Sequence, residues 1–129
     1  LIYFNIPLIH IHLYILVVLL SFIFTLGTGF LLSSMYVFLR DLNEIWSVVT
    51  RAWWFATPIF YTMSPSGPGA KLSLFNPLYY IIHLSRELLI YNRIPSIEMF
   101  IGLAGFSCGS LIIGYLVFLK LRHKLVDLL

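Results

Sequence analysis

Charged side chains are scarce in this chain of 129 residues, and three long stretches have none. Asp, Glu, Lys and Arg make up 10% of the residues, compared with about 25% in ordinary soluble domains. They are absent from residues 1–39, 52–70 and 99–119. A helix needs roughly 20 apolar residues to cross a bilayer core about 30 Å thick, and isolated charges are costly there. The pattern excludes an ordinary soluble domain and predicts an all-α integral membrane protein.

Several kinds of site are missing as well. Cys108 is the only cysteine, which excludes an internal disulfide framework and a cysteine-rich zinc site. His10 and His12 are interpreted as interfacial side chains, because two residues two positions apart face different sides of a helix. No GxxxxGK[ST] loop is present to cradle a phosphate. We therefore expect no catalytic residue, metal ligand or cofactor here, and the net charge of +3 does not indicate nucleic-acid binding.

The apolar stretches predict three transmembrane helices, at 13–38, 42–61 and 98–120. Helices in lipid approach one another most closely where small residues line up. The first span carries such a stripe at steps of four, formed by Ser21, Thr25, Gly29 and Ser33. The third carries the pair Gly105 and Gly109, followed by Ser110 and Gly114. We expect both sets to mark helix packing, within the chain or across a dimer.

Residues 70–92 follow a turn cluster rich in Pro and Gly and differ from the spans. Asn76 and Pro77 suit an N-cap and a first helical position. A helix from Leu78 to Tyr91 would be about 21 Å long, too short to cross. One side of it would carry Tyr80, His83, Glu87 and Tyr91, with Arg86 nearby. We expect a re-entrant or interfacial helical segment.

Basic residues give the orientation. Lys120, Arg122 and Lys124 close the chain, so the positive-inside rule places the C-terminus in the cytoplasm. Counting back, the re-entrant segment is extracytoplasmic and Arg40 is cytoplasmic.

The second span carries an unusual aromatic face. Trp46 suits an interfacial anchor, whereas Trp53 and Trp54 lie toward the middle of the span. Aromatic faces stack on sugars while hydroxyl and indole N–H groups bond to them, so this face is either ordinary packing or the lining of a glycan path. Arg51, inside the same span, must snorkel, pair or face water.

Several segments together resemble one family. The runs are Phe38–Leu42 (FLRDL), Trp53–Tyr61 (WWFATPIFY), Asn76–Tyr80 (NPLYY) and Arg86-Glu87. In this order they resemble the C-terminal half of the permease subunit of type-2 ABC exporters of polysaccharide, of the O-antigen, capsule and teichoic acid type. The resemblance covers about residues 13–122.

The resemblance implies half of a six-span, multi-pass permease of the cytoplasmic membrane. It also implies a homodimer with two copies of a separate ATPase, which binds ATP and Mg, and a lipid-linked glycan as substrate. The residues it assigns to the substrate path are Trp53, Trp54, Phe55 and Tyr61, with Arg51 as a further candidate. Those assigned to the re-entrant element are Asn76, Pro77, Tyr80 and Arg86, and those of the cytoplasmic turn are Arg40 and Asp41.

Other readings stay open at this point. The chain begins with Leu and lacks the family's main coupling helix, so we expect a fragment without its N-terminal part. A type-2 ABC permease for a drug or lipid would share the same architecture. An integral membrane enzyme acting on lipid-linked sugars would need acidic or histidine clusters outside this chain, and a purely structural assembly subunit would need no ATPase.

Overall fold

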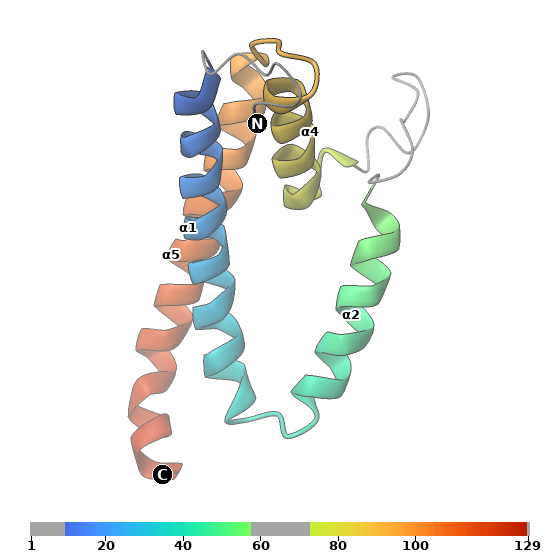
Figure 1. The fold of residues 1–129 in the computed structure, drawn as a ribbon. Coiled ribbons are helices and arrows are strands. Elements are labelled where there is room, and N and C mark those ends of the chain that lie inside the picture. Colours follow the sequence, from blue (N-terminus) through green and yellow to red (C-terminus); the bar gives the residue numbers. More distant parts are fainter. Residues whose placement is uncertain (1–9, 58–72, 129) are drawn as a thin grey trace. The chain divides into compact units, whose positions relative to one another are not determined.

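The computed structural model describes residues 10–57 and 73–128, with side chains up to Arg122. Within these ranges the chain is helical and has no strand, so the predicted all-α class is confirmed. The helices are α1 (Ile11–Tyr36), α2 (Leu42–Ala56), α4 (Pro77–Leu89) and α5 (Ile97–Leu128), shown in Figure 1.

Two helices are long and apolar enough to cross a membrane, Ile11–Tyr36 in α1 and Ile97–Arg122 in α5. Only 11% and 17% of their most apolar windows are buried inside the chain. Large apolar side chains such as Phe22, which is 61% exposed, therefore face outward. A soluble protein would cover such surface with its own core, so these faces require lipid or another chain.

The predicted second span is described only in part. Helix α2 has 15 residues, a length of about 22 Å, and the predicted range 42–61 continues into residues outside the described part. The three-span count therefore stays a prediction.

The chain divides into two compact units, each considered by itself. One comprises Leu1–Ser21 with Thr57–Gly105, and the other comprises Phe22–Ala56 with Phe106–Leu129. Helices α1 and α5 each contribute residues to both units.

In the second unit α1 and α5 lie side by side and run in the same direction (Figure 1). The Ser110 hydroxyl donates to the carbonyl of Phe24 at 3.3 Å. Farther along both helices, the ring of Phe30 lies 6.5 Å from that of Tyr115 and 5.6 Å from that of Phe118. Residue numbers rise together on the two helices, which is the register of a parallel pair.

Two glycines let these helices touch backbone to backbone. A Cβ atom on Gly27 would lie 2.4 Å from the backbone nitrogen of Leu111. A Cβ atom on Gly114 would lie 2.2 Å from the carbonyl oxygen of Gly27. Any side chain at either position would force the two backbones to shift, because a backbone neighbour cannot move aside as a flexible side chain can.

The small-residue stripe predicted at Ser21, Thr25, Gly29 and Ser33 does not make this contact, so that prediction is wrong for packing within the chain. Thr25, Gly29 and Ser33 are exposed, and a Cβ on Gly29 would meet nothing within 4 Å. Residues four positions apart are rotated by about 40° relative to one another around a helix. A stripe of this spacing therefore cannot face one straight partner helix along its whole length. Gly27 and Ser34, seven residues apart, are the buried small residues.

The packing set predicted on α5 is confirmed in part. A Cβ on Gly105 or Gly109 would meet nothing within 4 Å. Ser110 and Gly114, the other two members of the set, do lie at the contact with α1.

In the first unit, α4 begins as predicted. The Asn76 side chain accepts a hydrogen bond from the backbone N–H of Leu78 at 3.0 Å, and Pro77 takes the first helical position. A proline is tolerated there because its missing N–H would have no helical partner. The helix is followed by Asn92, whose φ of 49° is left-handed, a conformation that asparagine tolerates better than most residues.

The buried face of α4 consists of Pro77, Tyr80, Leu84 and Leu88. Of the residues predicted to share one side of this helix, Tyr80 is buried, His83 and Glu87 are half-buried and Tyr91 is exposed. The Tyr80 hydroxyl donates to the carbonyl of Leu74 at 2.9 Å. A Cβ on Gly102 of α5 would lie only 2.5 Å from Cε1 of Tyr80, so this ring packs directly over a glycine.

Candidate functional site

The candidate path residues of α2 gather in part. Thr50, Arg51, Trp54 and Phe55 line an open recess on the helix surface. The rings of Trp54 and Phe55 lie 5.4 Å apart and nearly perpendicular, at 82°, a favoured edge-to-face arrangement. Trp54 is 52% exposed and Phe55 is 74% exposed, so both rings are accessible on this chain.

Trp53 stands apart from this group. It is half-buried and does not line the recess of Arg51, Trp54 and Phe55, because at about 100° per residue it lies on the opposite side of Trp54 from Phe55. Tyr61 lies outside the described residues. The assignment of these residues to a substrate path stays a prediction.

Arg51 is exposed on α2. Within residues 10–57 and 73–122, no carboxylate lies within ion-pair distance of it. Its guanidinium shares the recess with a hydroxyl and two aromatic rings, and aromatic faces attract cations. The sequence left three alternatives for Arg51: to snorkel, to pair or to face water. Its exposed position beside two aromatic rings fits the last of these.

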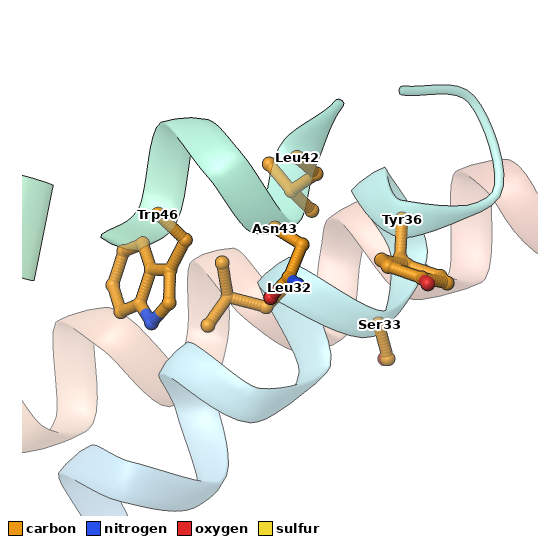
Figure 2. A pocket seen from close by; sticks show the side chains of 6 residues that line it. All are labelled: Leu32, Ser33, Tyr36, Leu42, Asn43 and Trp46. Carbon is orange, nitrogen blue, oxygen red and sulfur yellow. The ribbon is translucent and has the colours of Figure 1, made fainter. Parts of the chain in front are cut away.

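A second recess lies in the same unit, where α1 ends and α2 begins (Figure 2). Its volume is about 210 Å³. It is lined by Leu32, Ser33, Tyr36, Leu42, Asn43 and Trp46. In Figure 2, Trp46 and Asn43 of α2 lie next to Leu32 of α1, and Ser33 and Tyr36 lie closer to the end of α1. The lining thus combines two aromatic rings, an amide and a hydroxyl with aliphatic side chains.

The turn between these helices contains Arg40 and Asp41, both exposed. The backbone N–H of Leu42 donates to the carbonyl of Leu39 at 3.1 Å, and that of Ile45 donates to the carbonyl of Asp41 at 3.1 Å. The second bond opens α2 directly after Asp41. Arg40 and Asp41 therefore do form a turn, while their role toward an ATPase stays a prediction.

The residues predicted to shape the re-entrant element occupy different environments. Asn76, Pro77 and Tyr80 are buried and Arg86 is half-buried. The Asn76 amide donates to the hydroxyl of Thr57 at 2.9 Å. The carbonyl of Arg86 accepts from the backbone N–H groups of Ile90 and Tyr91 at the end of α4.

Sequence reasoning missed three of the residues that organise these sites. Thr57 was not connected with the helix that follows Asn76, yet it is 2% exposed and bonded to Asn76. Gly102 and Gly27 were not assigned to helix packing, because neither belongs to a GxxxG pair or a step-of-four stripe. A search at alternating steps of three and four could have found Gly27.

Among the residues that the structure describes, no group of three or more His, Cys, Asp or Glu side chains could hold a metal ion. The Nδ1 atom of His83 is buried without a hydrogen-bond partner, and its ring lies 5.5 Å from that of Tyr79. This single histidine is a packed side chain of α4.

The chain is 29% identical over 121 residues to the O-antigen export system permease protein RfbA of Myxococcus xanthus. The predicted resemblance is confirmed. The alignment covers 92% of this chain and 46% of that protein, so the chain spans about half the length of this curated relative. The similarity to an export permease agrees with the two exposed helices that are long and apolar enough to cross a membrane. No family model and no solved structure matches the chain.

Proposed function

We propose that the chain is part of the membrane-spanning subunit of an ATP-driven ABC exporter, which moves lipid-linked polysaccharide outward across the cytoplasmic membrane. One observation carries the proposal: the similarity to an O-antigen export permease extends over 92% of the chain. The exposed apolar surfaces of α1 and α5 agree with lipid or protein neighbours in a membrane.

The parallel course of α1 and α5 supports three crossings. Two parallel spans require the chain between them to return through the bilayer once. Helix α2 is the candidate for this crossing. Its predicted span, 42–61, is long enough to cross, and a segment that crosses lipid in an α-helical protein must be helical. Helix α4, with 13 residues, is about 20 Å long and would be the extracytoplasmic re-entrant or interfacial element.

On this proposal two permeases pair and bind two ATPase subunits, which hold ATP and Mg. Hydrolysis there opens the path between the permeases alternately to each side. Arg51, Trp54 and Phe55 line part of that path, and the turn at Arg40 and Asp41 lies on the cytoplasmic side. The basic residues Lys120 and Arg122, in the last turns of the apolar part of α5, are consistent with a cytoplasmic C-terminus.

A pull-down tests the class of protein. The full-length protein is tagged at its native locus, extracted in mild detergent and analysed by mass spectrometry, with an unrelated multi-pass protein as the control. We expect a stoichiometric partner that carries a Walker A sequence. Reproducible absence of any ATPase from an otherwise intact complex would contradict the proposal.

A further inference from the structure

The recess between the end of α1 and the start of α2 has the size of a small site. Its volume is about 210 Å³, whereas pockets for drug-sized ligands start at roughly 300 Å³. It therefore suits one small ring rather than an extended chain. Its walls come from two helices of a single unit, so the geometry is built by one continuous stretch of chain.

The lining is neutral. No Asp, Glu, Lys or Arg lines the recess, although Arg40, Asp41 and Glu44 are close in sequence. Phosphate and pyrophosphate groups are normally bound by Arg, Lys or clustered N–H groups. The side chains that line the recess therefore give an anionic headgroup no cationic partner.

The lining is also amphipathic. Trp46 is half-buried and Tyr36 is exposed. The Trp46 ring is therefore held by its neighbours, whereas the Tyr36 side chain can change its rotamer. The Asn43 amide can donate and accept hydrogen bonds, and its side chain makes none within the described ranges. An acyl chain over Asn43 would bury that amide without a partner, which is unfavourable. A pyranose offers both an apolar face and hydroxyl groups.

We infer that the recess lined by Tyr36, Asn43 and Trp46 binds one neutral glycosyl unit of the exported glycan. The inference rests on the proposed function. Trp46 stacks on the apolar face of the sugar, while Asn43 and Tyr36 bond to its hydroxyl groups. With the predicted orientation this recess lies at the cytoplasmic end of the spans, where an exported glycan enters.

Saturation-transfer NMR on the full-length transporter, purified with its partners in styrene–maleic acid nanodiscs, tests this inference. Nanodiscs avoid glycoside detergents, which would occupy a sugar site. The probes are the methyl glycosides of glucose, galactose, rhamnose and N-acetylglucosamine, with glucose 1-phosphate as the anionic comparison. We expect at least one neutral glycoside to bind wild type, and binding at least tenfold weaker in Asn43→Ala and Trp46→Ala.

Phe22→Ala is the matched control, since it removes an exposed aromatic ring of α1 outside the recess. It should bind the glycosides as wild type does. Asn43 is exposed, so its alanine variant should assemble normally, as judged by size exclusion and by ATPase content. Equal binding in all variants, no binding of any neutral glycoside, or preference for glucose 1-phosphate would overturn the inference. A copurifying ATPase in any of these cases leaves the exporter proposal standing, whereas its absence removes both.

Discussion

The two units hold their helices together in different ways. In the second unit, α1 and α5 meet backbone to backbone at Gly27 and Gly114, with aromatic contacts from Phe30 farther along. In the first unit, α4 is held by side-chain hydrogen bonds of Asn76 and Tyr80 and by the packing of Tyr80 on Gly102. Long apolar helices in lipid gain little from burial and depend on close contact, whereas a short capped helix can depend on specific polar bonds.

Helix α5 takes part in both kinds of contact, and a different glycine is used for each. Gly102 faces a side chain and Gly114 faces a backbone. A side chain can shift and a backbone cannot, so the two positions should differ in their tolerance of a methyl group. The following variants, made in the full-length protein, test that difference.

Gly114→Ala should have the largest effect, because the new methyl group would lie 2.2 Å from the carbonyl oxygen of Gly27. We expect a loss of about 3 kcal/mol in stability, at the upper end for overpacking. The midpoint of thermal unfolding, followed by fluorescence-detected size exclusion, measures it. Gly109→Ala is the control, since a Cβ there meets nothing within 4 Å. Equal midpoints for the two variants would refute the backbone contact.

Asn76→Ala should cost about 2 kcal/mol, of which about 1 comes from the lost helix cap and about 1 from the broken bond to Thr57. Thr57→Val keeps the cap and removes the buried bond to Asn76, so it should cost about half as much. The same unfolding assay compares the two. If Thr57→Val costs as much as Asn76→Ala, the cap contributes nothing and the account of α4 is wrong.

Gly102→Ala should cost about 1 kcal/mol, at the lower end for overpacking, because the ring of Tyr80 can move away from the new methyl group. The cost should disappear in a Tyr80→Leu background, which removes the ring and its clash. A double-mutant cycle measures this coupling. Additive costs in the cycle would show that Gly102 acts through some other neighbour.

Gly29→Ala should leave stability unchanged or raise it by up to about 1 kcal/mol, since alanine favours the helix and no atom lies within 4 Å of the new methyl group. This variant separates small residues that pack within the chain from those that only resemble a packing stripe. A clear destabilisation of the assembled transporter would place Gly29 against a partner chain.

Much of this fold was predictable from the sequence, and the reasons are local. Charge-free stretches predicted the apolar helices α1 and α5, and the Asn76–Pro77 pair predicted the start of α4. The packing faces were not predictable in the same way, because they depend on which partner helix lies where. Gly29 and Gly27 are equally small, yet only Gly27 lies against Leu111. The recess at Trp46 was also missed, since Tyr36 belongs to α1 and only the turn at Arg40 and Asp41 brings the two helices together.

Export of the glycan itself tests the central claim most directly. The full-length gene is deleted from its host and restored on a plasmid, and lipid-linked glycan is quantified inside the cell and on its surface. We predict that the deletion strain retains the glycan in the cytoplasm and that the wild-type gene restores surface glycan. We also predict that a Walker A lysine variant of the copurified ATPase reproduces the deletion. Unchanged surface glycan in the deletion strain, with the same amount inside, would contradict the account.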